Sequence, residues 1–597
     1  MIKISDYIAR RLHELGCRHV FMVTGGAAMH LNDSFARASS PYQVVFCHHE
    51  QACAIAAEGL YRAAGKIGVV NATSGPGGLN TLTGVMGQWT DSIPAIYVSG
   101  QVKHGTTLDC CRDLALRQLG DQEVDIIPIV SSLTKYAVSI KDPGAVRYEL
   151  EKAFHLATVG RMGPVWLDIP MDVQGAMVDA TTLRAFLPPV EVPNPCDVSA
   201  VVELLRASRR PVVVAGHGIR LARQIETLQS VLGMLRIPAL ATFGGFDLVA
   251  NDHPCYAGRI GTLGTRGGNF SLQNADLVLL LGTRNNVRQV SYNWENFAHR
   301  ATTIAVDVDS AELQKPTFRP THAVHSDLAD FLPRLQAALA SERTLGDYSD
   351  WLRWAKERTA RYPAVRPEHR VVAERIQPYP FFEQFTRQLP DDAVVVAGNG
   401  TACVVLFQAG VVRAGQRYFW NSGCASMGYD LPAAVGAALG VKRDVWCLAG
   451  DGSLQMNLQE LATLSHNRLP VKLLVLNNGG YVSIRQTQTN FFGAHYGCGN
   501  TSGLSFPDLE RLAAAYDLPY LCSSRLEEVE AHQRRAAAIA GPVVWEVRLN
   551  LDYSFEPKLS SMRLPDGRMV SKPLEEMAPF LERDEFLSNM LVPVDEP

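Results

Sequence analysis

The stretches DVWCLAGDGS (444–453) and VKLLVLNNGG (471–480) each place a run of apolar residues directly before glycine and polar side chains. An earlier stretch, DDAVVVAGNG (391–400), has the same form. Short apolar runs rich in β-branched residues that stop at glycine are typical of buried parallel strands ending in a turn. The pattern therefore predicts an α/β domain with a parallel sheet in this part of the chain.

Two polar side chains stand at the ends of these predicted strands. The chain between Asp451 and Asn478 is long enough for a crossover helix and a second strand beside the first. A carboxylate and an amide oxygen would then meet at one edge of the sheet. Such hard oxygen ligands suit Mg²⁺, and the nearby glycines leave room for a phosphate chain. The alternative is an Asp that only caps the next helix.

The same alternation of apolar runs and helical stretches continues toward the N-terminus. IGVVNATSG (67–75) and PAIYVSGQ (94–101) predict strands in the first third, and RRPVVVAGHGIRLARQ (209–224) begins a second series. Between them, FLPPVEVPNPC (186–196) holds four prolines and reads as a linker. We predict three α/β domains with doubly wound parallel sheets at 1–185, 197–345 and 370–550, followed by a C-terminal tail at 551–597.

Composition limits the classes of protein to which the chain can belong. Of its 597 residues 47% are hydrophobic, and the formal net charge is −4, which argues against a disordered chain and against nucleic acid as partner. The N-terminus reads as an amphipathic helix with Ile4, Ile8 and Leu12 on one side, and no apolar run approaches the roughly 20 residues needed to span a membrane. The 12 cysteines include no Cys-x-x-Cys pair. We expect a cytoplasmic protein with reduced cysteines and no membrane partner.

The segment from Gly450 to Asn478 resembles the signature of thiamine diphosphate enzymes. The similarity extends over nearly the whole chain to the acetohydroxyacid (acetolactate) synthase and pyruvate oxidase group. This resemblance implies a pyrimidine-binding, a central and a diphosphate-binding domain. It implies that Asp451, Asn478 and the main-chain carbonyl of Gly480 bind Mg²⁺, and that the cofactor also contacts Thr401, Gly452, Ser453 and Tyr481.

The first domain carries the other half of the implied cofactor site. HHEQACAIAAEG (48–59) matches the family segment whose glutamate contacts the aminopyrimidine, which makes Glu50 the implied catalytic carboxylate. A carboxyl group against that ring favours the imino tautomer, which can remove the thiazolium C2 proton. Three further segments, TGGA (24–27), ATSGPGGLN (72–80) and CASMGYDLPAA (424–434), resemble family loops at the cofactor and contribute Gly25, Gly26, Pro76, Asn80 and Met427, the last as the residue that bends the cofactor.

The central domain resembles the flavin-binding version found in acetohydroxyacid synthases. A lone Gly-x-Gly is weak evidence, but acidic residues after a strand are well placed for ribose or adenine. The combination indicates FAD, although relatives without flavin keep the same fold, so that alternative stays open. The implied FAD residues are Gly216, Gly218, Thr265, Arg266, Gly282, Arg284, Asp307 and Asp327.

Between Gln101 and Gln122 the chain departs from the branched-chain synthases, because it is several residues longer there. Asp121 stands where those synthases carry a Phe that packs on their keto-acid acceptor, so a polar acceptor is implied. Gln122 follows it as a catalytic candidate. With the run RQLG (117–120), this segment resembles the flavin-containing thiamine carboligases that attach a two-carbon branch to nucleotide-activated keto sugars.

The preferred prediction is therefore an enzyme that decarboxylates a 2-keto acid such as pyruvate and passes the two-carbon unit to such a sugar. Acetolactate formation with pyruvate as acceptor is the runner-up, and a pyruvate oxidase-like oxidoreductase is a third reading. A non-catalytic scaffold is disfavoured because Glu50, Asp451 and Asn478 are all present. The family arrangement also implies a homodimer or homotetramer in which Glu50 of one chain meets Asp451 of another.

Overall fold

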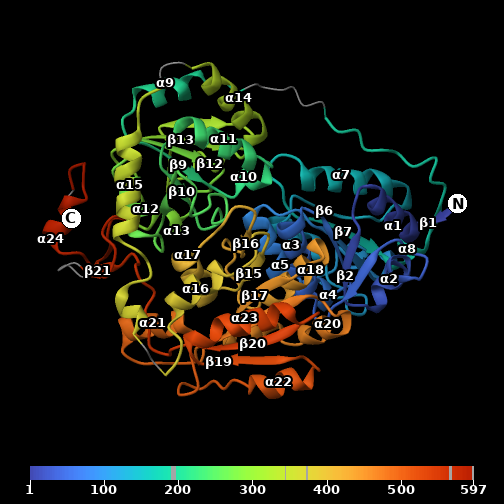
Figure 1. Ribbon diagram of the computed structural model, residues 1–597. Coiled ribbons are helices and arrows are strands. Elements are labelled where there is room, and N and C mark those ends of the chain that lie inside the picture. The colour runs from blue at the N-terminus through green and yellow to red at the C-terminus, as the bar shows by residue number, and fades with distance from the viewer. Residues whose placement is uncertain (190–195, 343–344, 372–373, 564–567, 595–597) are drawn as a thin grey trace.

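The computed structural model describes residues 1–189, 196–342, 345–371, 374–563 and 568–594, so most of the predicted linker lies outside the described residues. Within them the chain forms three domains, each built on a six-stranded parallel sheet with helices on its faces (Figure 1). This confirms the predicted α/β fold with doubly wound parallel sheets. No helix in these ranges has both the length and the apolar character that crossing a bilayer would require.

The N-terminal sheet has the strand order β3-β2-β4-β5-β7-β6. Its first helix buries Ile4, Ile8 and Leu12 completely in one cluster with strand residues, as the amphipathic pattern predicted. The strands are β2 (His19–Met22), β3 (Gln43–Phe46), β4 (Gly68–Ala72), β5 (Ile96–Gln101), β6 (Tyr136–Ser139) and β7 (Val165–Pro170). The main helices are α1 (Ile4–Glu14), α2 (Met29–Ala36), α3 (Glu50–Ala64), α4 (Pro76–Asn80), α5 (Leu82–Asp91) and α7 (Val146–Thr158).

The central sheet has the order β11-β10-β9-β12-β13-β14. Starting from β9, the strands β10 and β11 follow on one side and β12, β13 and β14 follow on the other, so the strand order reverses between β9 and β12. Open α/β sheets bind ligands at the strand carboxyl ends beside such a reversal. The strands are β9 (Pro211–Ala215), β10 (Ala239–Ala241), β11 (Tyr256–Arg259), β12 (Leu277–Leu281), β13 (Thr302–Asp307) and β14 (His322–His325). The main helices are α9 (Ser199–Ala207), α11 (Ile225–Leu235), α12 (Arg266–Gln273), α14 (Leu328–Ser341) and α15 (Ser349–Arg361).

The third sheet has the order β16-β15-β17-β18-β20-β19. Strands β17 and β18 are parallel neighbours, as the sequence predicted from their glycine ends. The strands are β15 (Val394–Ala397), β16 (Arg417–Phe419), β17 (Val445–Gly450), β18 (Val471–Asn477), β19 (Tyr520–Ser523) and β20 (Val543–Arg548). The main helices are α16 (Pro378–Arg387), α17 (Thr401–Ala409), α18 (Asp430–Val441), α19 (Asp451–Leu454), α20 (Glu460–Asn467), α21 (Val482–Phe492), α22 (Leu509–Ala515) and α23 (Val529–Ala538).

Helices α3 and α18 join the first domain to the third. A Cβ on Gly436 would lie 1.8 Å from the carbonyl oxygen of Ala56, and one on Gly59 would lie 2.1 Å from that of Ala433. Glycine is therefore required at both positions, because the two backbones approach too closely for a side chain. This contact fixes the helix that begins with Glu50 against the helix that follows Met427.

The C-terminal tail leaves β20 and returns to the central domain, where it lies beside α15 (Figure 1). Three buried amide side chains, two within α12 and one directly after it, hold the tail. Asn269 Nδ2 donates to the carbonyl of Leu574, Gln273 Nε2 donates to Glu575, and Asn274 Nδ2 donates to the carbonyl of Asn589. The tail thus spans from the third domain to the central one.

Candidate functional site

One end of the candidate site lies where three neighbouring strands of the third sheet finish. Thr401 follows β15, Asp451 follows β17 and Asn478 follows β18. All three side chains are buried. The parallel arrangement therefore brings together three of the residues singled out from the sequence.

The Asp451 carboxylate is held by the backbone around it. Its Oδ1 accepts the Gly452 N–H at 2.8 Å, and its Oδ2 accepts the Gly480 N–H at 3.0 Å. Burial raises the pKa of Asp451 to about 6. Gly480 has a φ of +121°, and a Cβ there would lie 2.2 Å from the Cys498 carbonyl oxygen, so only glycine suits the position.

Asn478 presents an oxygen that no described part of the protein uses. Its Nδ2 donates to Thr401 Oγ1 at 3.2 Å and to Tyr553 Oη at 3.1 Å. Its buried Oδ1, by contrast, has no hydrogen-bond partner among the described residues. A buried acceptor of this kind normally has a partner. A free amide oxygen beside a buried carboxylate fits a divalent cation that prefers oxygen ligands.

The adjoining loops pack closely around this end. A Cβ on Gly452 would lie 2.2 Å from Tyr481 Cε1, so the tyrosine ring lies directly over the glycine. Ser453 Oγ donates to Asp430 Oδ2 at 2.6 Å and accepts the Gly428 N–H at 2.8 Å. The half-buried Met427 precedes that glycine, so its loop is tied to the Asp451 turn.

Glu50 marks a second cluster, at the carboxyl end of the first sheet. It begins α3, is 9% exposed, and its Oε2 accepts from Asn80 Nδ2 at 3.0 Å. Gly25 packs against the segment that leads from β4 to Asn80, because a Cβ on Gly25 would lie 2.4 Å from Thr73 Cβ. The Gln122 carbonyl oxygen would lie 2.4 Å from a Cβ on Gly75, directly before Pro76, while Gly26 borders open space. The structure therefore groups Glu50, Asn80, Gly25, Pro76 and Gln122.

The functional groups of the two clusters make no direct contact by hydrogen bond within one chain. Among the described residues, no hydrogen bond or ion pair joins Glu50 to Asp451 or Asn478. Each cluster holds only part of what the sequence assigned to one cofactor.

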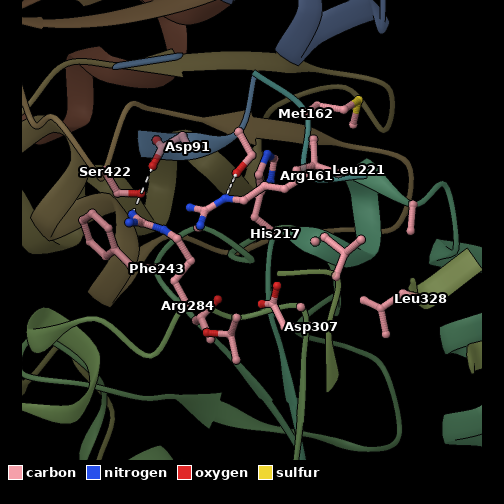
Figure 2. A pocket seen from close by; sticks show the side chains of 18 of the residues that line it. Asp91, Arg161, Met162, His217, Leu221, Phe243, Arg284, Asp307, Leu328 and Ser422 are labelled. Carbon is pink, nitrogen blue, oxygen red and sulfur yellow. Dashed lines mark hydrogen bonds and ion pairs between the residues drawn. The ribbon is translucent and has the colours of Figure 1, made fainter. Parts of the chain in front are cut away.

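A cavity of about 410 Å³ lies at the carboxyl ends of the central strands, where all three domains meet (Figure 2). That size falls within the usual range for small-molecule pockets. Gly216 packs behind it, since a Cβ there would lie 2.3 Å from the Gly282 carbonyl oxygen. The predicted residues that line the cavity are Gly218, Gly282, Arg284, Asp307 and Asp327.

Thr265 and Arg266 lie away from this cavity lining. Thr265 caps α12 by accepting the Gly268 N–H, and Arg266 donates to the carbonyls of Met577 and Pro579 in the tail. These two side chains therefore hold a helix end and the tail.

Basic side chains outnumber acidic ones in the cavity wall. Arg284 reaches Asp91 of the first domain at 3.4 Å (Figure 2). Arg161 contacts Asp309 at 2.7 Å. Burial lowers the pKa of His217 well below its usual value, and its buried Nε2 has no partner in the described structure. Burial raises the pKa of Asp307 to about 6. Guanidinium groups and a free imidazole nitrogen at the strand-order reversal fit a phosphate-containing dinucleotide such as FAD.

Several side chains at these sites were missed by sequence reasoning. Asp91, Arg161 and Ser422 reach the cavity from the other two domains, and Tyr553 reaches Asn478 from the tail. Asp91, Arg161 and Ser422 follow no strand of the central sheet, and Tyr553 lies in an irregular segment beyond β20, so no local motif marks them.

The sequence matches three domains described for thiamine pyrophosphate enzymes. Residues 2–128 match the N-terminal TPP binding domain, 198–335 the central domain and 398–547 the C-terminal TPP binding domain. The acetolactate synthase isozyme 2 large subunit of Escherichia coli (strain K12) is 31% identical, over 96% of this chain and 100% of the relative. The acetolactate synthase of Arthrospira platensis is 30% identical, over 92% and 94%. This chain belongs to the thiamine pyrophosphate enzyme family, in its acetolactate synthase and pyruvate oxidase group.

Proposed function

We propose that this enzyme uses thiamine diphosphate and Mg²⁺ to decarboxylate a 2-keto acid, with pyruvate as donor, and transfers the two-carbon unit to an acceptor carbonyl. The free, buried Oδ1 of Asn478 beside the buried Asp451 carboxylate is the observation that carries this proposal. The names of the relatives, which are acetolactate synthases, support a carboligase.

Each cluster has a distinct task in this proposal. Asp451, Asn478 and the Gly480 carbonyl would hold Mg²⁺. Thiamine diphosphate, when bound, supplies a nucleophilic carbon at thiazolium C2. Glu50 would exchange a proton with the ring nitrogen of the aminopyrimidine, and its contact with Asn80 keeps it oriented for that exchange.

We further infer that the active form is a homodimer or a pair of such dimers. Glu50 and Asp451 share no contact in one chain, whereas one cofactor needs both. Large apolar side chains are exposed around each cluster, with Phe46 at 52% and Leu79 at 37% near Glu50, and Met456 at 44% and Ile484 at 45% near Asp451. A second copy that covers both faces would complete two cofactor sites at once.

For the acceptor we propose a nucleotide-activated keto sugar. The segment that follows β5 forms a compact loop around the buried carboxylate of Glu123, which accepts the N–H groups of Leu108, Leu119 and Gly120. The exposed side chain of Asp121 lies in this loop beside Gln122 and supports a polar acceptor. The relatives' names favour pyruvate as acceptor instead, so acetolactate synthesis is the second candidate.

The central cavity supports FAD as an additional cofactor, with Arg284 and Arg161 facing its phosphates and Asp307 facing a ribose or adenine. Reduction of bound flavin by pyruvate without oxygen, in step with turnover, would instead indicate a pyruvate oxidase-like reaction. Flavin that stays oxidised while products form supports the carboligase.

The first test incubates the protein with thiamine diphosphate, Mg²⁺, FAD and pyruvate, with and without a nucleotide-activated keto sugar. We expect carbon dioxide release that rises when the sugar is added, and a branched sugar detected by mass spectrometry. Acetolactate as the sole product would select the second candidate. If no pyruvate is consumed under any condition, the proposed donor is wrong.

A further inference from the structure

The C-terminal tail places a hydroxyl group directly against the metal-binding end of the third sheet. Tyr553 follows β20, and its Oη lies 3.1 Å from Asn478 Nδ2 and 2.6 Å from Thr401 Oγ1. Asn478 Nδ2 also lies 3.2 Å from Thr401 Oγ1. The amide and the two hydroxyls therefore form a closed triangle of hydrogen bonds.

This triangle decides which way the Asn478 amide points. The two N–H bonds of the amide supply one donor for each hydroxyl oxygen, so both contacts are satisfied in the observed orientation. A flipped amide would offer its oxygen to two hydroxyls, but the bond between Tyr553 and Thr401 already uses one of their two hydrogens. One of the two contacts would then be lost.

We propose that Tyr553 is a positioning residue that turns the Asn478 amide so that Oδ1 faces the Mg²⁺ site. The inference rests on the proposed function, which places Mg²⁺ at Asp451 and Asn478. Partners that orient a metal ligand typically change metal affinity by about 10-fold to 100-fold when they are removed. The tail is accordingly part of the metal site, although it lies outside all three sheets.

The tail backbone around Tyr553 is held independently of the Tyr553 hydroxyl. Gln486 Nε2 donates to the Tyr553 carbonyl at 2.9 Å, and the Glu556 N–H donates to Tyr379 Oη at 2.6 Å. Gln408 Nε2 donates to the Pro557 carbonyl at 2.5 Å. Tyr553→Phe should therefore remove the hydroxyl and leave the tail in place.

The test is a calorimetric titration of Mg²⁺ into chelator-treated protein at a fixed, saturating concentration of thiamine diphosphate. We expect Tyr553→Phe to raise the Mg²⁺ dissociation constant about 10-fold to 100-fold. Turnover at saturating Mg²⁺ should return to within about 2-fold of the wild type, because the hydroxyl orients a ligand and touches no reacting atom.

Tyr379→Phe is the matched control, since it also removes a hydroxyl that holds the tail but lies away from Asn478. It should leave the Mg²⁺ dissociation constant unchanged. Equal affinities for Tyr553→Phe and wild type would overturn the inference, as would an equal weakening in both variants or a loss of turnover that Mg²⁺ does not restore. If the wild type itself shows no Mg²⁺-dependent binding of thiamine diphosphate, the proposed function fails as well.

Discussion

Glu50 combines burial with a single polar contact, and this combination suits a group that must exchange a proton without reorganising its surroundings. It lies at the first position of α3, where the positive end of the helix dipole stabilises a carboxylate. Asn80 fixes one oxygen and leaves the other beside Gly77, where a Cβ would lie 3.6 Å away. The free oxygen can therefore face a ligand.

Glu50→Gln keeps the shape of the side chain and its ability to accept from Asn80, but it cannot hold the transferred proton. We expect normal folding, judged by the melting temperature, and turnover reduced by about 10² to 10⁴-fold, the usual contribution of a positioned acid or base. The steady-state rate of carbon dioxide release measures the effect. Wild-type turnover in this variant would show that Glu50 has no catalytic role.

At this scale the sequence placed some residues of the candidate site near one another and missed others. Asp451 and Asn478 could be placed together because both follow glycine-ended strands, and parallel strands end at the same edge. Tyr553 lies 75 positions after Asn478 in an irregular tail, and Asp91 meets Arg284 across 193 positions. Contacts of that kind depend on how domains and tail pack, which no local pattern encodes.

Among the helices, α3 begins with Glu50 and also contains two buried charged residues, Glu58 and Arg62. Glu58 is fully buried and shares the Arg62 guanidinium with Asp91, which Arg284 of the central domain also contacts. Burial raises the pKa of Glu58 from its ordinary value of 4.5 to about 7. The hydroxyl of Tyr429, the residue directly before α18, lies near the Glu58 carboxyl group. The ion cluster depends on Asp91 at the end of α5, so the sequence of α3 alone could not predict it.

A raised carboxyl pKa makes stability depend on pH in a defined direction. The folded state holds the Glu58 proton more tightly than the unfolded chain, so its contribution is complete below about pH 4.5 and is lost as pH rises through about 7. The melting temperature should therefore decline over this interval. Glu58→Gln, which cannot ionise, should flatten the decline, whereas Glu14→Gln on the exposed face of α1 should not. An unchanged slope in Glu58→Gln would mean that Glu58 stays charged throughout.

Across the whole molecule, the candidate sites lie where separate parts of the fold meet. The central cavity is lined by residues from all three domains, and the tail connects the Asn478 end of the third sheet with α12 of the central domain. If two copies of the chain face each other, the Glu50 cluster of one copy and the Asp451 cluster of the other would likewise form one site between them. Because Glu50 and Asp451 would then come from different chains, mixing two variants can test this arrangement.

The test combines two inactive variants, Glu50→Gln and Asp451→Ala, co-expressed with different affinity tags so that mixed dimers can be purified. If each cofactor site takes Glu50 from one chain and Asp451 from the other, a mixed dimer has one doubly defective site and one intact site. Purified mixed dimers should then recover roughly half of the wild-type activity per dimer, because one of the two symmetric sites is complete. If both groups instead came from the same chain, every site would carry one defect and mixed dimers would stay as inactive as either parent.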